Sequence, residues 1–323
     1  MKSIPGLLAS LCVVSGLAGQ QPPDIGPPPG RLVDIGGRTL HLLCSGRGSP
    51  TVVLEAGASA FAIDWTLVQR DVARTTRVCS YDRIGFGWSD PATPGSPATV
   101  SKDLHDLLQK AGEKPPYVLV GASLGGLHVR SYTADYPEQV AGMVLVDPAA
   151  ETRLFAMFQG QAVTIASLSA EQMRSTIPPG WVRLPPRSPQ TGAPFDRLPP
   201  DLYATRIKLD QRLIASFPDS VSYDMRVASI ERDRARLARL LALSQTVQHP
   251  LGARPLVVLT RGVEWSQGLH EAHEGLTRLS TNSRHTRVEG AGHEIHLFAP
   301  AAVITAIADV VGAVRGDGKL RSP

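Results

Sequence analysis

The sequence predicts an α/β protein in which a mostly parallel sheet is covered by helices on both faces. Short apolar runs alternate with helical patterns along most of the 323 residues. Continuous apolar strands of this kind are typical of parallel sheets that are buried on both faces. One such strand, at 117–120, leads directly into Gly-Ala-Ser-Leu-Gly at 121–125 and then into a helix. The length is sufficient for one large domain with a sizeable core.

The strands follow from apolar runs and from the turn residues that bound them. Residues 31–35 and 38–44 are expected to form a hairpin around Gly36 and Gly37, because glycine accepts the backbone angles of a tight turn. The other predicted strands are 51–54, 77–81, 117–120, 142–146, 255–260 and 284–288. Together these segments predict an eight-stranded sheet.

Helices are expected where the apolar residues change to helical spacing. The segment 64–73 places Trp65, Val68 and Val72 on one face, as in an amphipathic helix. A second helix, 100–111, ends at Gly112, and glycine is a frequent residue after the end of a helix. The remaining helices are predicted from 127 onwards, at 267–280 and at 300–315.

Residues from about 150 to 248 break the alternation of strands and helices. The segment contains three Pro-Pro pairs, at 178–179, 185–186 and 199–200. Helical patterns occur near 152–174, 201–216 and 226–245. Because the segment lies between two strands of one sheet, we expect an inserted helical cap within a domain that spans 31–323.

The N-terminus has the features of a secretory signal peptide over residues 1–18. Lys2 precedes an apolar stretch, 4–17, that is short for a membrane span, and small residues stand at Gly16 and Ala18. The Pro-rich residues 19–30 are expected to form an extended linker. The predicted location is therefore secreted or periplasmic, with no stable membrane span after signal cleavage. An uncleaved anchor is the alternative.

The charge distribution does not predict a nucleic-acid partner. The net charge of +4 is small for this length. The arginines gather only in 232–239, where interspersed leucines indicate the solvated face of an amphipathic helix.

Ser123 is the candidate nucleophile. It lies in a Gly-x-Ser-x-Gly motif between a strand and a helix, which is the context that a nucleophile elbow requires. The glycines allow strand and helix to approach closely. The amide of Leu124 would then stand at a helix N-terminus, where it can stabilise a developing oxyanion. The alternative is a chance motif in a loop, which the flanking strand and helix disfavour.

His293 is the candidate base, because a serine hydroxyl needs a base within hydrogen-bond reach. It follows the last predicted strand after Gly-Ala-Gly at 290–292, which lets the ring reach over the sheet edge. His270 and His273 lack the His-Glu-x-x-His spacing of a zinc site, so we expect a solvated helix face and no metal. His128 is expected to pack within the helix that follows the elbow.

The chain resembles the α/β-hydrolase family from about residue 31 to residue 314. The resemblance is carried by the elbow at 121–125, by Tyr-Asp-Arg-Ile-Gly-Phe-Gly-Trp-Ser-Asp at 81–90, and by Gly-Ala-Gly-His at 290–293. It implies the α/β-hydrolase fold, with the base after the nucleophile in chain order. The loop 81–90 is expected to pack beside the active site, with Phe86 or Trp88 lining the pocket.

The resemblance leaves two candidates for the acid that orients His293. Most family members carry this acid in the loop after the penultimate strand, where Glu264 stands. Others carry it directly after the strand that follows the elbow helix, where Asp147 stands before Pro148. We place Asp147 first and Glu264 second. A purely structural Asp147 that caps a turn is the alternative reading of that position.

Two further features are implied by the resemblance. Family members often have His-Gly after the strand 51–54, whereas this chain has Ala56 and Gly57, so the backbone amide of Ala58 is the expected second oxyanion donor. The usual strand order places the second and fourth strands side by side. That order would bring Cys44 and Cys79 together as a disulfide, and two buried free thiols are the alternative.

These features predict a serine hydrolase that acts through an acyl-enzyme. Ser123 would attack a carbonyl, His293 would transfer the proton, and the amides of Leu124 and Ala58 would hold the oxyanion. The expected substrate is a small-molecule carboxylic ester, and no cofactor is expected. An amide or peptide hydrolase, a perhydrolase and a non-catalytic binding protein of the same fold are the alternatives. Dehalogenases and epoxide hydrolases are disfavoured, because they use aspartate where this chain has Ser123.

Overall fold

The computed structural model describes residues 24–92, 100–153, 155–184, 187–216, 220–264 and 266–320. The predicted signal peptide, 1–18, and the first part of the predicted linker, 19–23, lie outside these residues. Within the described ranges, none of the helices combines the length and the apolar character that crossing a membrane would require.

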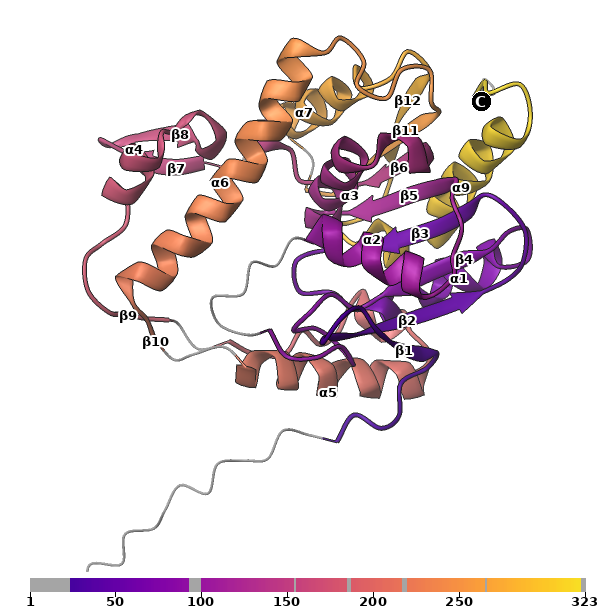
Figure 1. The fold of residues 1–323 in the computed structure, drawn as a ribbon, viewed down its shortest axis with the longest axis horizontal. Coiled ribbons are helices and arrows are strands. Elements are labelled where there is room, and N and C mark those ends of the chain that lie inside the picture. Colours follow the sequence, from indigo (N-terminus) through magenta and orange to yellow (C-terminus); the bar gives the residue numbers. More distant parts are fainter. Residues whose placement is uncertain are drawn as a thin grey trace, which may run out of the picture.

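The centre of the molecule is an eight-stranded sheet with the order β1-β2-β4-β3-β5-β6-β11-β12 (Figure 1). The first hairpin is antiparallel, β2 is antiparallel to β4, and all remaining pairs are parallel. The predicted sheet is thus confirmed. The strands are β1 (Arg31–Asp34), β2 (Thr39–Ser45), β3 (Thr51–Glu55), β4 (Val78–Tyr81), β5 (Tyr117–Ala122), β6 (Val140–Val146), β11 (Leu256–Arg261) and β12 (Ser283–Val288).

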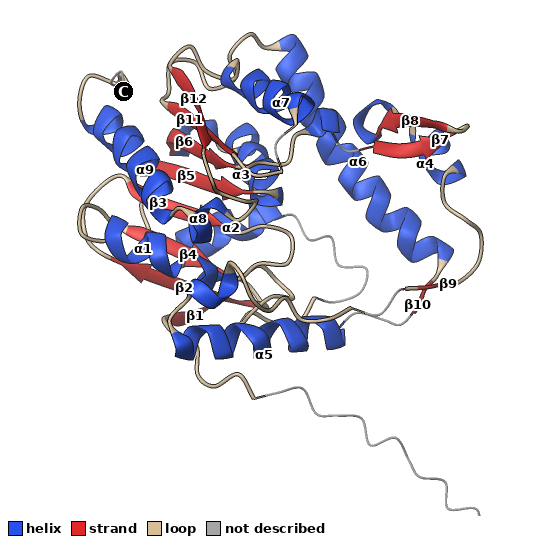
Figure 2. Ribbon diagram, turned by 180° about the vertical axis from the view of Figure 1, so that it is seen from behind, coloured by secondary structure: helices blue, strands red, loops and turns tan. Residues whose placement is uncertain are grey.

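Helices cover both faces of the sheet (Figure 2). One face carries α1 (Thr66–Val72), α8 (Ile295–Phe298) and α9 (Pro300–Arg315); the other carries α2 (Val100–Lys110), α3 (Leu124–Asp135) and α7 (Gln267–Thr277). Successive side chains of a strand point to opposite faces. Leu119 of β5 therefore packs in the core with Tyr132 of α3, while Val118 and Val120 pack in the core with Val303 of α9. Full burial of each such side chain contributes about 1.5–3 kcal/mol.

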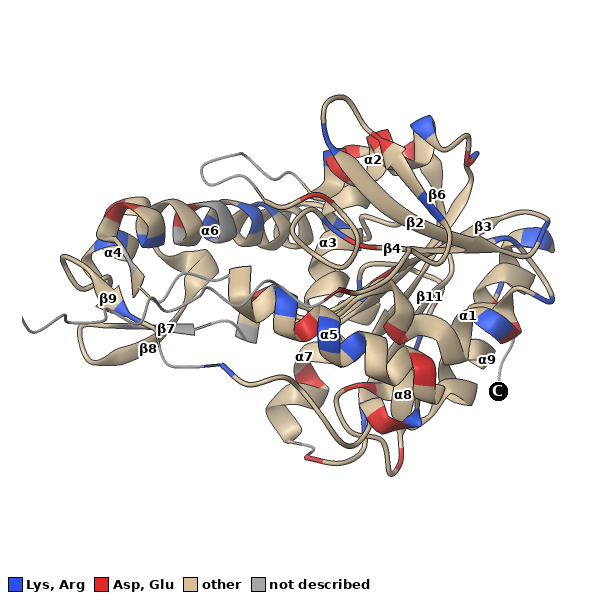
Figure 3. Cartoon of the chain, turned by 90° about the horizontal axis from the view of Figure 1, so that it is seen from below, with Lys and Arg blue, Asp and Glu red and all other residues tan. Residues whose placement is uncertain are grey.

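The segment between β6 and β11 adds no described strand to the main sheet. Its helices are α4 (Ala170–Ser175), α5 (Pro200–Ser216) and α6 (Tyr223–Thr246). Leu209 of α5 packs against Phe61, and Leu237 of α6 packs against Leu127 of α3, so the two longer helices cover different parts of the sheet domain. Both helices carry acidic as well as basic residues (Figure 3).

The prediction of a helical pattern over 152–174 is wrong for its middle part. Residues there form an antiparallel hairpin of β7 (Phe155–Phe158) and β8 (Gln161–Thr164). Gln159 and Gly160 join the strands with φ values of 50° and 78°, which are the left-handed angles of a tight hairpin turn. Glutamine is not among the residues that usually indicate such a turn, and for this reason the hairpin was not predicted from the sequence. A second pair, β9 (Val182–Arg183) with β10 (Ser220–Val221), is shorter still.

The described residues before β1 lie against the sheet domain. Ile25 packs in the cluster that contains Phe61. Trp88 donates a hydrogen bond from Nε1 to the carbonyl oxygen of Gly26, at 2.9 Å. Trp88 therefore contacts the N-terminal segment, and neither it nor Phe86 is among the residues that line the cavity beside Ser123.

A disulfide joins the second and fourth strands. The antiparallel register of β2 and β4 places Cys44 directly opposite Cys79, and their sulfur atoms are bonded. The pairing agrees with the strand order that the family resemblance implied. It ties the antiparallel edge of the sheet to the strand that ends at Tyr81.

Loss of this disulfide is expected to lower the free energy of unfolding by about 3–4 kcal/mol. The reason is that the bond spans a sequence separation of 35 residues and so restricts the unfolded chain. Urea unfolding with and without dithiothreitol measures the effect. The double variant Cys44→Ala/Cys79→Ala should be similarly destabilised and insensitive to the reductant. Equal midpoints for oxidised and reduced wild type would contradict the expectation.

Candidate active site

Ser123 lies at the turn between β5 and α3, with φ 51° and ψ −121°. This backbone conformation is strained for a residue other than glycine. Two glycines make the turn possible. A Cβ atom on Gly121 would lie 2.5 Å from the carbonyl oxygen of Gly125, and a Cβ atom on Gly125 would lie 2.5 Å from the carbonyl oxygen of Glu55. The strand, the helix and the end of β3 therefore meet around the serine with no room for a side chain between them.

Hydrogen bonds from the Ser123 backbone hold the strained turn. Its N–H donates to the carbonyl oxygen of Val146 at 3.1 Å. Its carbonyl oxygen accepts from the amides of Gly126 at 3.0 Å and Ala149 at 2.9 Å. The segment from Val146 to Ala149 also contains Asp147, so the position of the serine is fixed relative to that carboxylate.

The His293 imidazole bridges Ser123 and Asp147. Its Nε2 lies 2.9 Å from Ser123 Oγ, and its Nδ1 lies 2.5 Å from Asp147 Oδ2. The hydrogen bond with Asp147 raises the pKa of His293 above its ordinary value of 6.5, although burial opposes the shift. This arrangement can take a proton from a serine hydroxyl and stabilise the imidazolium that results.

Asp147 is buried and is held by β11, the neighbouring strand. Its N–H donates to the carbonyl oxygen of Leu259 at 2.8 Å, and its Oδ1 accepts from the N–H of Arg261 at 3.0 Å. The guanidinium Nε of Arg261 lies 3.5 Å from the other carboxylate oxygen, Oδ2. These contacts orient the carboxylate so that Oδ2 faces His293.

Glu264, the second candidate acid, lies outside this arrangement. Its side chain is 78% exposed, and its nearest described charge partner is Arg261, whose Nη1 lies 3.6 Å from Oε2. The structure thus brings Asp147 against His293 and leaves Glu264 at the surface. Both residues follow neighbouring parallel strands, so sequence position alone could not separate them.

Backbone amides near Ser123 Oγ come from two segments. Leu124 is the first residue of α3, and the first N–H groups of a helix have no partner within it. The loop after β3 supplies the other amides. A Cβ on Gly57 would lie 3.4 Å from Ser123 Cβ, and Gly57, Ala58 and Ser59 line the same cavity as Ser123. This arrangement can offer donors from both segments to an oxyanion.

A cavity of about 160 Å³ opens beside Ser123. Its volume is equivalent to about five water molecules. Most of its lining comes from the sheet domain, including His293. The cap adds three side chains: Gln190, Phe195 and Arg206. A ligand in this cavity would therefore contact both the sheet domain and the cap.

Arg206 of α5 is fully buried and connects the cap to the sheet domain. Its Nε donates to Asp64 Oδ1 at 3.0 Å, and its Nη2 donates to Gln190 Oε1 at 3.0 Å. Asp210 lies 3.6 Å from Nη1, and the guanidinium stands 3.6 Å above the Phe195 ring. Burial raises the pKa of Asp64 to about 6, against the effect of Arg206. Two carboxylates thus balance this cation, so it does not mark a site for an anionic substrate.

His296 was not predicted to line the cavity. It is 5% exposed, and its ring lies 4.6 Å from the ring of Trp65. Burial lowers its pKa to about 3, which makes it a neutral imidazole. Sequence reasoning also missed Gln190 and Arg206, because their place in the cavity depends on how the cap packs, and no local pattern records that packing.

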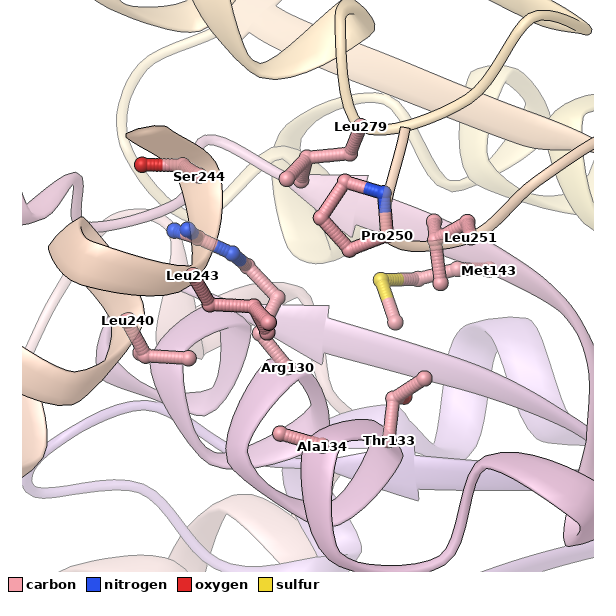
Figure 4. A pocket seen from close by; sticks show the side chains of 10 residues that line it. All are labelled: Arg130, Thr133, Ala134, Met143, Leu240, Leu243, Ser244, Pro250, Leu251 and Leu279. Carbon is pink, nitrogen blue, oxygen red and sulfur yellow. The ribbon is translucent and has the colours of Figure 1, made fainter. Parts of the chain in front are cut away.

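A separate, smaller cavity of about 40 Å³ lies between α3 and α6 (Figure 4). Its volume is close to that of a single water molecule, and Ser123 is not among its lining residues. Arg130, which lines it, binds Glu151 through two hydrogen bonds of 2.6 and 2.7 Å. The cavity is therefore a packing gap beside a buried ion pair rather than a substrate site.

The prediction of a solvated face for His273 is wrong. His273 is fully buried, with Nε2 2.7 Å from the carbonyl oxygen of Pro148 and Nδ1 2.7 Å from Thr260 Oγ1. It faces inward because α7 packs on β11 at this position. His273 thus supports the segment that follows Asp147, while His270 remains partly exposed.

Among the described residues, the ligand atoms of Cys44, Cys79 and Glu113 lie close enough together to hold a metal ion. The two sulfur atoms are bonded to each other. The group therefore offers no thiolate, which is the form of cysteine that binds metals.

Comparison with known proteins relates the sequence to a family. The sequence model of a family described as alpha/beta hydrolase fold matches residues 50–300. An AB hydrolase superfamily protein of Gibberella zeae is 34% identical over 103 residues, which cover 30% of this chain and 32% of that protein. The chain spans between 18% and 42% of the length of the first four curated relatives it matches.

Solved structures show the same fold. The epoxide hydrolase CorEH has a TM-score of 0.61 at 15% identity, over 88% of this chain and 99% of that chain. Carboxylesterase CesB from Bacillus subtilis has a TM-score of 0.54 at 18% identity, over 87% of this chain and 90% of that chain. At such identities the likeness concerns the fold alone.

Gly125→Ala is expected to lower the free energy of unfolding by about 2 kcal/mol or more. The added Cβ would lie 2.5 and 2.8 Å from the carbonyl oxygens of Glu55 and Ala56, and backbone must move to admit it. Gly312→Ala in α9 is the matched control. Its Cβ would meet no atom within 4 Å, so the free energy of unfolding of this variant should be about 0.5–1 kcal/mol higher than that of wild type. Urea unfolding that finds Gly125→Ala as stable as wild type would refute the close-packing argument.

Proposed function

The chain belongs to the α/β-hydrolase fold family, and we propose that it is a serine hydrolase that cleaves small carboxylic esters through Ser123. The observation that carries the proposal is the hydrogen-bonded series from Ser123 Oγ through His293 to Asp147. A nucleophile, a base and an acid that orients the base, all within hydrogen-bond reach, are what acyl transfer requires.

In the proposed reaction, Ser123 Oγ attacks the carbonyl carbon of the ester while its proton moves to His293 Nε2. Asp147 stabilises the imidazolium, and the amides of Leu124 and Ala58 hold the tetrahedral oxyanion. The intermediate collapses as His293 returns the proton to the departing alkoxide. A water molecule then attacks the acyl-enzyme with His293 as base, which releases the carboxylic acid and restores Ser123.

The cavity beside Ser123 supports a small substrate. Its volume of about 160 Å³ is below the range of roughly 300–1,000 Å³ that is usual for pockets of drug-sized ligands. The lining is partly polar, with Ser59, Gln190 and the neutral His296. Because Arg206 is balanced by Asp64 and Asp210, an uncharged ester fits the site better than an anionic one.

We further propose that the chain is exported, with residues 1–18 removed as a signal peptide and 19–30 as a linker before the domain. The Cys44–Cys79 disulfide supports this, because disulfides persist mainly in oxidising compartments. Within the domain, about 150–248 is proposed to act as the cap that sets the substrate range.

A fluorophosphonate probe is expected to label wild-type protein once, and Ser123→Ala not at all. Asp147→Asn should label at least about 100-fold more slowly, because His293 loses the group that orients it. Glu264→Gln is the matched control and should label within about twofold of wild type, since its side chain is exposed. Intact mass spectrometry follows the adduct on all four proteins.

The possible outcomes separate the parts of the proposal. A folded wild type with no adduct would refute the serine hydrolase. Slow labelling in Glu264→Gln with normal labelling in Asp147→Asn would reverse the assignment of the acid. The same masses report on export, since a removed signal peptide leaves a chain that begins at Gly19.

The rate constant kcat/KM is expected to fall as the pH drops through the pKa of His293, because only the neutral imidazole accepts a proton. The hydrogen bond with Asp147 raises that pKa, so the midpoint should lie above pH 6.5 in wild type. In Asp147→Asn the carboxylate charge is lost, and the midpoint should move to lower pH. Profiles for wild type, Asp147→Asn and Glu264→Gln test the shift. An unmoved midpoint in Asp147→Asn would contradict it.

A further inference from the structure

One buried side chain binds three successive carbonyl groups of the loop that lies beside Ser123. Arg83 donates from Nη1 to the carbonyl oxygen of Ala56 at 2.8 Å. From Nη2 it donates to the carbonyl oxygens of Gly57 at 2.6 Å and Ala58 at 3.3 Å. Arg83 is only 8% exposed, so these bonds are shielded from water and from competing partners.

These contacts determine where the amides of the loop point. In a planar trans peptide, the carbonyl of one residue and the N–H of the next point in opposite directions. With the Gly57 carbonyl bound to Arg83, the N–H of Ala58 must point away from the guanidinium. Arg83 does not line the cavity beside Ser123, whereas Gly57 and Ala58 do. With the carbonyls held on the Arg83 side, the Ala58 N–H lies on the opposite side of its peptide plane, where it can face the cavity.

Arg83 is itself fixed by a fully buried carboxylate. Glu55 Oε1 lies 2.7 Å from Arg83 Nη1, and Glu55 also accepts hydrogen bonds from the Tyr81 hydroxyl and from His128 Nδ1. The Phe86 ring stacks on the guanidinium, at 4.5 Å. Burial alone would raise the pKa of Glu55, but the charge of Arg83 and the bonds from His128 and Tyr81 outweigh it and lower the pKa. Glu55 thus remains an anion that holds the guanidinium in place.

We propose that Arg83 is a positioning residue that orients the oxyanion-binding amide of Ala58 through its bonds to the loop carbonyls. The inference rests on the proposed serine hydrolase. It assigns to the buried pair Arg83–Glu55 the orientation of a loop in which this chain lacks the histidine that family members often have. Lysine cannot take over this task, because its ammonium group is a point donor and cannot span three carbonyls and a carboxylate as the planar guanidinium does.

The test compares an oxygen ester with its matched thionoester, in which sulfur replaces the carbonyl oxygen. Sulfur is a poorer hydrogen-bond acceptor on a longer bond, so a well-placed oxyanion donor favours the oxygen ester. In Arg83→Lys we expect kcat on the oxygen ester to fall at least about tenfold with little change in KM. The oxygen preference, which is the ratio of kcat on the oxygen ester to kcat on the thionoester, should decrease in the same variant. Rates are expressed per serine labelled by fluorophosphonate at completion, so unfolded protein does not contribute.

Arg130→Lys is the matched control, because Arg130 also forms a buried pair with a glutamate, Glu151, but does not contact the loop. It should lose stability as Arg83→Lys does and keep both kcat and the oxygen preference. Ala58→Pro removes the amide hydrogen itself and leaves the buried pair intact. It is expected to shrink the oxygen preference as well, and it provides the test if Arg83→Lys does not fold.

The outcomes distinguish this proposal from the one on which it rests. If wild type does not hydrolyse the oxygen ester, both are overturned. If wild type is active and the oxygen preference is unchanged in Arg83→Lys, only the role of Arg83 is overturned. An unchanged preference in Ala58→Pro would overturn both the role of Arg83 and the assignment of the Ala58 amide as an oxyanion donor, and would leave Ser123 as the proposed nucleophile. A loss of preference in Arg130→Lys equal to that in Arg83→Lys would also overturn the role of Arg83, since a general loss of stability would then suffice.

Discussion

The close approach of three backbone segments around Ser123 is the constraint on which the rest of the site depends. The serine adopts φ 51° only because β5, α3 and the end of β3 meet at Gly121 and Gly125 without intervening side chains. A strained residue persists when its surroundings determine it completely, and here its N–H and its carbonyl are both bonded to the segment around Asp147. Ser123, the proposed nucleophile, and the segment that carries Asp147 are therefore held together by main-chain hydrogen bonds.

The sequence predicts the parts of this frame whose signals are local. Strands, helices and the order of Ser123 and His293 can be read from apolar runs and glycine-bounded motifs. Which acid contacts His293 could not be decided, because it depends on the bond between Asp147 and the amide of Arg261 on a neighbouring strand. His273 was assigned to solvent because helical spacing does not reveal which helix face meets a sheet. Arg83 lies in the motif 81–90, which was expected beside the active site, but its role could not be predicted, since its partners are the main-chain carbonyls of a loop more than twenty residues away.

Buried arginine side chains connect described segments of the chain that no helix or sheet hydrogen bonds join. Each is paired with at least one buried carboxylate, and each pair fixes a different segment of the chain. A buried ion pair of this kind is weak evidence for stability, since the desolvation of two charges offsets much of their attraction. Its clearer effect here is geometric, because a planar guanidinium donates hydrogen bonds in several fixed directions and so orients the groups that accept them. The pairs are Arg83–Glu55 at the loop after β3, Arg130–Glu151 at the start of the cap, and Arg206–Asp64 between α5 and the sheet domain.

The distance along the chain between Ser123 and His293 has a consequence for biosynthesis. The two residues are separated by 170 positions, so a ribosome completes the elbow, the neighbouring strands and the whole cap before it adds the base. In a chain that acts as proposed, a nascent or truncated product carries a nucleophile with no base beside it. Such a product does not hydrolyse the esters of the cell that makes it. Hydrolytic activity begins only when the last strand has joined the sheet and has brought His293 to Ser123.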